Sequence, residues 1–161
     1  MEACCDLQGF WHDGYIVIKE FALASLNGEI IEHYLFTAPF PFRKLNVQDI
    51  VTNSWLTSNY HHLEWYGGFV DYQKFPAIME RIGRKYKRLY VKGDQKQIAL
   101  WQILPRSCRI VDLGTEGCPT LFELSRSPAP RCSMNHPNCA LANTLRLRRW
   151  VNEMYWDSSR V

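Results

Sequence analysis

Apolar and β-branched residues are concentrated at the start of the chain, in runs separated by turn residues. The runs 3–7, 15–25 and 29–36 predict three strands, and Asn27 followed by glycine predicts a hairpin turn between the last two. Because tight turns join consecutive strands, we expect these strands to form an antiparallel meander.

The remainder of the chain alternates between helical and strand-like patterns. Ile78, Ile82 and Tyr86 recur every four residues, which indicates a helix over 69–88. Alternation of this kind is typical of a sheet flanked by helices. No repeat or linker divides the chain, so we predict one α/β domain over residues 1–161. The further predicted helices are 49–56, 96–104, 119–124 and 140–156, and the further predicted strands are 89–92 and 108–113.

Composition excludes some classes of protein. Hydrophobic residues make up 47% and charged residues 22% of the 161 residues, so the chain is not intrinsically disordered. The net charge of +3 permits nucleic acid as a partner without requiring it. The first residues lack a signal-peptide pattern, and no apolar run is long enough for a membrane helix. We therefore expect a cytoplasmic or nuclear protein, without membrane contact, whose six cysteines are free thiols or metal ligands rather than disulfides.

Short segments in a characteristic order resemble the motifs of DEDD-type 3′–5′ exonucleases. The segment 6–9 (DLQG) ends the first strand, where that family has Asp-x-Glu. Lys96 precedes Leu100 by four residues, where the family has an aspartate. The segment 140–143 (ALAN) opens the last helix, where the family has Ala-Leu-x-Asp. The resemblance spans nearly the whole chain and implies a ribonuclease H-like fold, a mixed sheet of antiparallel N-terminal strands and later parallel strands that is flanked by helices.

A second resemblance involves four other short segments. The chain is similar to small uncharacterised arthropod proteins that carry Asp-x-x-Gly-Phe, His-x-Leu-x-Trp, Tyr-Val-Lys-Gly and Gly-Cys-Pro. Here these segments are residues 6–10, 61–65, 90–93 and 117–119. This resemblance implies no particular function.

The resemblance to exonucleases implies a site with two magnesium ions held by four carboxylates. Only Asp6 remains, because Gln8, Lys96 and Asn143 stand at the other three positions. Such a cluster is close to neutral, so we expect no catalytic residues and no magnesium, with the four residues as vestigial positions. The Lys96 ammonium could pair with Asp6 in place of the metal. The alternative is that these residues are an ordinary strand-end aspartate and surface amides.

Two other polar features allow more than one interpretation. Glu20 stands among apolar residues and either pairs with Lys19 or faces solvent, and we expect solvent. His61 and His62 are adjacent and point in different directions, so a shared metal is not expected. We expect them to shape a loop beside the former active-site groove, with acid–base chemistry as a less favoured role.

Four metal-ligating residues follow one another as Cys-x13-Cys-x3-His-x2-Cys. Thiolate and imidazole ligands suit a closed tetrahedral zinc site, which would stabilise a segment, 118–139, that has few large apolar residues. Maelstrom-type domains offer an analogy, since they resemble DEDD exonucleases, lack the carboxylates and carry zinc. The alternative is that the cysteines are small core residues and the histidine belongs to a loop. The candidate ligands are Cys118, Cys132, His136 and Cys139.

Basic residues gather in two places, before the strand at 89–92 and on the last helix. Basic side chains pair with phosphates, and neighbouring aromatic rings can stack on bases. The alternative is a solvated basic face, which is common for such runs. The candidate nucleic-acid-binding residues are Arg81, Arg84, Lys85, Lys87, Arg88, Arg146, Arg148 and Arg149.

These patterns leave three functions open. The first is a non-catalytic module that binds single-stranded RNA or DNA and carries a structural zinc. The second is a scaffold that binds a protein partner through exposed aromatic residues. The third is a nuclease with a non-standard site, so enzymatic activity is not expected but stays open.

Overall fold

A mixed β-sheet forms the centre of the protein. The computed structural model describes residues 1–126 and 138–159. Within these residues the sheet has five strands in the order β3-β2-β1-β4-β5. The first three strands are antiparallel neighbours, whereas β4 is parallel to β1 and β5 is parallel to β4. The strands are β1 (Glu2–His12), β2 (Tyr15–Ser25), β3 (Ile31–Leu35), β4 (Arg88–Val91) and β5 (Arg109–Asp112).

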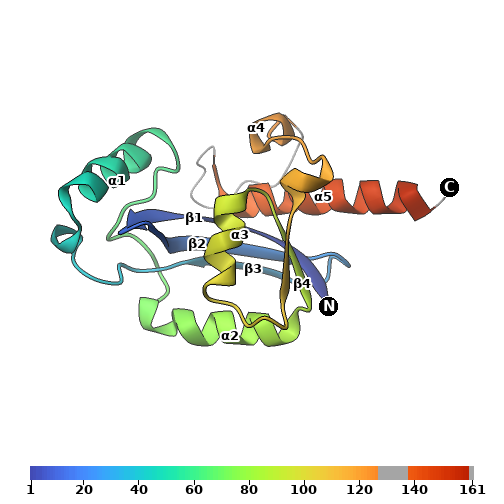
Figure 1. Ribbon diagram of the computed structural model, residues 1–161, viewed down its shortest axis with the longest axis horizontal. Coiled ribbons are helices and arrows are strands. Elements are labelled where there is room, and N and C mark those ends of the chain that lie inside the picture. Colours follow the sequence, from blue (N-terminus) through green and yellow to red (C-terminus); the bar gives the residue numbers. More distant parts are fainter. Residues whose placement is uncertain (127–137, 160–161) are drawn as a thin grey trace.

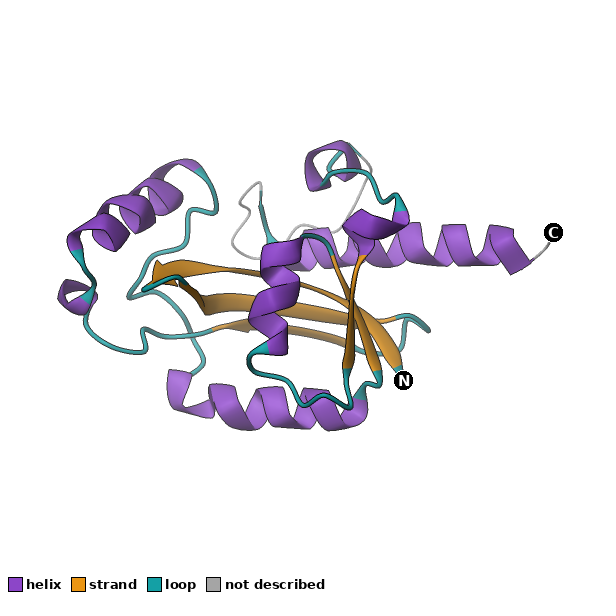
Figure 2. Ribbon diagram, in the orientation of Figure 1, coloured by secondary structure: helices purple, strands orange, loops and turns teal. Residues whose placement is uncertain are grey.

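Helices cover both faces of this sheet (Figures 1 and 2). In Figure 1, α2 runs below the sheet, α5 runs above it, and α1 lies at the end formed by the β1–β2 hairpin. The α-helices are α1 (Val47–Asn59), α2 (Phe75–Lys85), α3 (Asp94–Trp101), α4 (Leu121–Leu124) and α5 (Ala140–Ser159), and the 3-10 helices are η1 (Phe42–Lys44), η2 (Tyr72–Lys74) and η3 (Leu113–Glu116). In the described residues, no helix combines the length and the apolar character that crossing a bilayer requires. The predicted α/β class and mixed sheet are confirmed.

Side chains of β1 alternate between two cores. Cys5 and Leu7 pack with Met79 and other residues on the α2 side of the sheet. Cys4 packs with Leu147 on the α5 side. Because successive residues of a strand point to opposite faces, every second residue of β1 faces α5. These α5-facing positions include Asp6 and Gln8.

A β-bulge interrupts the pairing of β1 with β2. Gln8 pairs with Glu20, but Gly9 pairs with Ile18, so Lys19 has no opposite residue. A Cβ atom at Gly9 would lie 2.1 Å from the carbonyl oxygen of Val17, which explains the glycine at this position. Because the bulge adds one residue to β2 and none to β1, the side chains of β2 alternate between the two faces in opposite phase before and after Lys19.

Several predicted boundaries were wrong. β1 extends to His12 rather than ending near residue 7, and the turn into β2 is formed by Asp13 and Gly14, which both have positive φ (48° and 83°). The predicted helix over 69–88 is divided into an isolated bridge at Val70, η2 and α2. Pro76 lies in the first turn of α2, where its missing N–H is tolerated, so α2 begins there.

Candidate functional site

Asp6 lies fully buried at the centre of the sheet, on the face that α5 covers. Its Oδ1 accepts a hydrogen bond from Lys96 Nζ at 2.6 Å, and its Oδ2 accepts one from Asn143 Nδ2 at 2.9 Å. The side chain of Asp6 is 0% exposed and that of Lys96 is 16% exposed. The ion pair that the sequence suggested is therefore present, and the alternative of separate surface groups is wrong for these three residues.

The turn between β4 and α3 positions Lys96. Gly93 adopts a φ of 115°, which favours glycine, and its N–H donates to Asp112 Oδ1 at 2.9 Å. Helix α3 begins at the next residue, so its first turn carries Lys96 over the centre of the sheet. The strand–glycine–helix pattern of the sequence thus places this ammonium beside Asp6.

Gln8 connects the same strand to the start of α5. Its Nε2 donates to the carbonyl of Asn138 at 2.8 Å, and Asn138 Nδ2 donates to the carbonyl of Tyr60 at 2.7 Å. Gln8 is 4% exposed and Asn143 is 2% exposed. The four positions that the resemblance assigns to the carboxylates therefore all lie on the α5 side of β1, and Asn138 is a contact that the sequence gave no reason to expect.

Burial dominates the electrostatics of Asp6. Complete burial raises the pKa of this carboxyl above its ordinary value, because the low-dielectric interior disfavours the charged form. The Lys96 ammonium and the hydrogen bonds from Lys96 and Asn143 lower the pKa in part. The carboxylate thus depends on these two neighbours to remain ionised.

The expectation that Glu20 faces solvent is wrong. Glu20 is 0% exposed, and its Oε1 accepts the N–H of Ala140 at 3.1 Å. His33 Nε2 lies 2.8 Å from Glu20 Oε2. Glu20 pairs with Gln8 and shares its face of the sheet, and it is buried because the start of α5 covers that face. Lys19 is instead buried toward two carbonyl oxygens, of Phe36 at 2.6 Å and of Gly67 at 2.7 Å.

A hollow of about 210 Å³ lies beside Gln8 and Lys96 and is lined by Trp11, Tyr60 and Gln95 among others. A second hollow of about 180 Å³ shares Trp11 and Gln95 and continues toward the β1–β2 hairpin and the side of α3. Together they form a groove with amide and aromatic walls, which we call the amide–aromatic groove. The sequence gave little signal for this groove, because its residues come from β1, β2, α1, α3 and the segments that follow β1, α1 and α3. The residues that complete its lining are Leu7, Gly9, Phe10, Gly14, Tyr15, Ile16, Leu56, His61, Ile98, Ala99 and Gln102.

His61 lines this groove, as expected, and its ring supports the loop. Its Nε2 lies 2.9 Å from the carbonyl of Gly9, and its Nδ1 accepts the N–H of Leu63 at 3.1 Å. His62 has a positive φ of 58° and is exposed. The two adjacent histidines therefore occupy different surroundings.

The predicted zinc ligands are only partly within the described residues. Cys118 is 7% exposed and packs with Leu113 and Leu147, while Cys139 packs with Ala142 at the start of α5. Burial raises the pKa of the Cys118 thiol to about 11. Cys139 is disulfide-bonded, against the expectation of free thiols or metal ligands. The other two candidate ligands, Cys132 and His136, lie outside the described residues. Because Cys139 can bind zinc only when its disulfide is reduced, the tetrad stays a prediction.

The predicted basic residues are divided between the two sides of the sheet (Figure 1). Arg81, Arg84 and Lys85 are on α2, whereas the second group is on α5. Arg88 is on β4 and shares the face of Tyr90, which packs on the α5 side. In the first group, three arginines form ion pairs: Arg81 with Glu32, Arg84 with Glu80, and Arg88 with Glu2. In the second group Arg149 pairs with Glu153. The basic residues therefore do not form one continuous surface.

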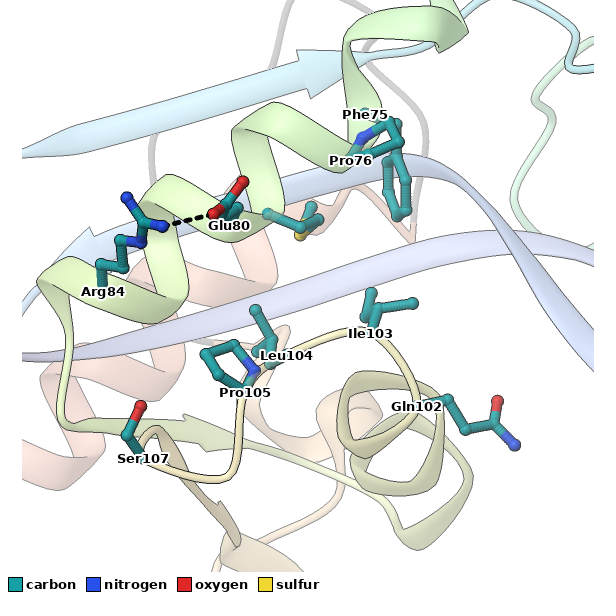
Figure 3. Close-up of a pocket in the computed structure, with 10 residues that line it drawn as sticks. Phe75, Pro76, Glu80, Arg84, Gln102, Ile103, Leu104, Pro105 and Ser107 are labelled. Carbon is teal, nitrogen blue, oxygen red and sulfur yellow. Dashed lines mark hydrogen bonds and ion pairs between the residues drawn. The ribbon is translucent and has the colours of Figure 1, made fainter.

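Another hollow, of about 660 Å³, lies between α2 and the loop from α3 to β5 (Figure 3). Its walls are largely apolar, with Phe75 and Pro76 of α2 on one side and Ile103, Leu104 and Pro105 on the other, and the Arg84–Glu80 ion pair lies at its rim. This hollow lies on the α2 side, away from Asp6. Its lining includes Arg84 but none of Asp6, Gln8, Lys96 and Asn143.

Among the described residues, one group of three potential ligands lies close together at the hairpin end. Ligand atoms of His12, Asp13 and Asp49 are within 4.8 Å of one another. Asp49 Oδ2 accepts hydrogen bonds from the N–H of Asp13 at 3.0 Å and from Asn46 Nδ2 at 2.9 Å. These contacts explain the group as a connection between the β1–β2 hairpin and α1.

No protein-family model matches this sequence, and no curated protein matches it. The geometry of the site therefore stands by itself as the basis for assigning a function.

Proposed function

We propose that this protein is a non-catalytic module that binds single-stranded RNA or DNA on a ribonuclease H-like fold. The observation that carries the proposal is the 2.6 Å contact between Lys96 Nζ and Asp6 Oδ1. An ammonium at that distance occupies the side of the carboxylate where a divalent cation would bind. In this proposal the nuclease site has become a fixed part of the core.

The order of the elements supports the ribonuclease H-like assignment. Antiparallel N-terminal strands are followed by parallel strands, as the resemblance to DEDD exonucleases implies. Asp6 comes from the first strand, Lys96 from the helix after β4 and Asn143 from the last helix. These are the places where the resemblance puts three of the four carboxylates.

Charge supports the absence of metal-dependent cleavage. Magnesium prefers several anionic oxygens, and each oxygen of Asp6 already accepts a hydrogen bond from Lys96 or Asn143. The second buried carboxylate on this face, Glu20, is held by Ala140 and His33. A magnesium pair would have to displace an ammonium and compete with these contacts.

The amide–aromatic groove supports a nucleic-acid ligand. Trp11, Tyr15 and Tyr60 offer flat faces on which bases can stack, and Gln8 and Gln95 offer amide groups that can bond to base edges. Arg146, Arg148 and Arg149 are on α5, the helix that also carries Asn143, whereas the other group is centred on α2. We therefore assign phosphate contacts to Arg146, Arg148 and Arg149 and regard the α2 group as a solvated face.

A binding assay tests the ligand. The probe is a fluorescent single-stranded oligonucleotide of about 12 nucleotides, a length that covers one such module. We expect its affinity for the protein to fall steeply as the salt concentration rises, because phosphate contacts release counterions. Tyr60→Ala should weaken binding several-fold, whereas Phe122→Ala, which removes an aromatic ring that is 72% exposed and outside the groove, should not. Equal affinity of the Tyr60→Ala variant, or no binding at low salt, would overturn the nucleic-acid proposal.

Restoring the carboxylates tests the degenerate site. The triple variant Gln8→Glu/Lys96→Asp/Asn143→Asp rebuilds the expected set around Asp6, and we expect it to bind Mn²⁺ in calorimetry while the natural protein does not. The matched control is Gln95→Glu/Gln97→Glu, which adds negative charge on α3 beside the site. Cleavage of oligonucleotides by the natural protein in Mg²⁺ or Mn²⁺, lost in Asp6→Ala, would show instead that the site is an active nuclease.

Elemental analysis tests the proposed structural zinc. Protein purified under reducing conditions without chelators should contain about one equivalent of zinc if Cys118, Cys132, His136 and Cys139 form a closed site. Less than about half an equivalent would reject the tetrad. In that case Cys139 keeps its disulfide instead of binding zinc.

The alternative function is a scaffold that binds a protein partner. It is favoured by a separate observation, because the apolar side chains of Val47, Val51 and Trp55 are exposed on α1.

A further inference from the structure

Helix α1 turns two polar residues inward and three large apolar residues outward, although Ile50 packs against an apolar cluster as in an ordinary surface helix. Asn53 is 0% exposed and Asp49 is 9% exposed, and both face the end of the β1–β2 hairpin. On the opposite side, Val47, Val51 and Trp55 are 78%, 61% and 57% exposed. A surface helix normally turns its apolar stripe toward the core and its polar residues toward water. The outward apolar face of α1 therefore needs an explanation other than folding of the single chain.

Polar contacts hold α1 against the hairpin. Asn53 Oδ1 accepts the N–H of Trp11 at 2.8 Å, and Asn53 Nδ2 donates to the carbonyl of Trp11 at 2.9 Å. Asn46 caps the helix by accepting the N–H of Asp49 at 2.8 Å. Since these bonds fix the inner face, Val47 and Val51 are not required to hold the helix in place.

The outward face has a regular pattern. Val47, Val51, Ser54 and Ser58 follow at intervals of four, three and four residues, which is the spacing of a seam between two packed helices. All four are exposed, as is Trp55 at the edge of the seam. Apart from the buried Asp49, the helix carries no acidic or basic residue. An uncharged seam with two large and two small residues is suited to close packing.

The pattern is self-complementary about its centre. In an antiparallel pair of α1 helices related by a two-fold axis, Val51 lies opposite Ser54 of the other copy, and Val47 lies opposite Ser58. Each valine then meets a small residue rather than another valine, and no like charges meet. Trp55 covers the edge of the seam from each side. A membrane surface is a poorer match, because a helix that binds membranes carries basic residues along its polar flank.

We propose that the outward face of α1 is a homodimer interface, with two copies of this chain packed through antiparallel α1 helices. A helix of this length, roughly 20 Å at 1.5 Å per residue, buries less surface than a standard interface. The dimer is consequently weak and forms at micromolar concentration or above. The proposal does not rest on nucleic-acid binding, which is measured with dilute protein.

Sedimentation equilibrium of the whole chain tests the dimer, over roughly 1 to 500 µM, a range that brackets weak interfaces. We expect a reversible monomer–dimer equilibrium, weakened at least tenfold by Val51→Asp. Gln48→Asp adds the same charge at an exposed position of α1 outside the seam and should leave the equilibrium unchanged. Because Val51 is exposed, thermal melting of the dilute variant should match that of the natural protein.

Cross-linking tests the antiparallel register. We mix two copies of different size, one with Val51→Cys and one with Ser54→Cys, under mild oxidation. The mixed pair should form a disulfide-linked heterodimer more readily than Val47→Cys with Ser54→Cys, which the two-fold arrangement keeps apart. The natural protein, whose Cys4, Cys5, Cys108 and Cys118 are buried, is the background control.

Three results would overturn the proposal. The first is a monomer at every concentration, and the second is a dimer that Val51→Asp does not weaken. The third is a Val51→Cys chain that links to itself but not to Ser54→Cys, which indicates parallel helices. A monomer that binds neutral phosphatidylcholine vesicles and loses this binding in Val51→Asp would assign the same face to a membrane instead.

Discussion

On the α2 side of the sheet, β1 contributes Ala3, Cys5 and Leu7 to an apolar core, whereas on the α5 side the same strand contributes Cys4, Asp6 and Gln8. The first core is stabilised by excluding water from apolar surface. The second adds a chain of buried polar groups whose hydrogen bonds must all be made. A strand that serves both cores shows that one face can be specialised for a polar site while the other supplies stability.

The largest expected effect comes from the apolar side. Phe21→Ala removes a ring that is 0% exposed in the α2-side core, and we expect unfolding free energy to fall by about 4 kcal/mol, because a cavity remains. The effect should not vary with pH, since Phe21 does not titrate. Urea denaturation at pH 5 and pH 8 measures both points. Phe69→Ala removes a ring that is 81% exposed and should change the stability by less than about 0.5 kcal/mol. A loss at Phe21 below about 1 kcal/mol would show that this core is loosely packed.

The next largest effect is on the polar side. Lys96→Met leaves the buried Asp6 with Asn143 alone, and we expect a loss of about 3 kcal/mol near neutral pH. Burial already raises the pKa of Asp6 in the folded state above its unfolded value, and losing the ammonium raises this pKa further. A raised carboxyl pKa contributes stability below the unfolded pKa and loses it as pH rises through the folded pKa. The deficit of Lys96→Met should thus be larger at pH 8 than at pH 5.

A double variant separates charge from packing at this pair. Asp6→Asn/Lys96→Met removes both charges, so it should recover most of the stability lost in Lys96→Met. Lys44→Met, at an exposed lysine, is the matched control and should be close to neutral. If the double variant is as unstable as Lys96→Met alone, the unpaired charge is not the cause of the loss.

Lys19, the extra residue of the β-bulge, should have a smaller effect on stability that appears only at alkaline pH. Burial lowers the pKa of Lys19 from 10.5 to about 8, so the folded state releases this proton first. Unfolding free energy should therefore rise as pH increases from about 8 to 10.5, by at most about 3 kcal/mol. Urea denaturation across this range compares the natural protein with Lys19→Met, which should lack the rise. Identical pH profiles would show that Lys19 does not titrate in this way.

The smallest expected effect concerns the start of α5. Glu20→Gln keeps an acceptor for the Ala140 N–H but weakens the contact with His33, and we expect a loss of about 1 kcal/mol. Amide hydrogen exchange should accelerate for the first turn of α5 more than for α2. If amide exchange in Glu20→Gln accelerates in α2 as much as in α5, the α2 side and the α5 side of the sheet do not open separately.

Local patterns of the sequence predicted the α/β class. The Asp6–Lys96 contact was suggested by the resemblance to DEDD exonucleases, which places both residues in one site. The burial of Glu20 was missed because the second face of β2 is covered by α5, whose first residue, Ala140, lies 120 positions away in the sequence. The inward polar residues of α1 were missed because Asn53 bonds to the backbone of Trp11, a residue 42 positions away. Contacts between distant segments leave no periodic signal.

The thiols of Cys4 and Cys5 stand in the central strand, fully covered, and burial raises the pKa of both above the ordinary value. Alkylating reagents attack the thiolate, so these two sulfurs stay inert while the sheet is intact. Labelling at Cys4 and Cys5 would then record the opening of the innermost strand. The rate at which Cys4 and Cys5 are alkylated should therefore report the rate of global unfolding.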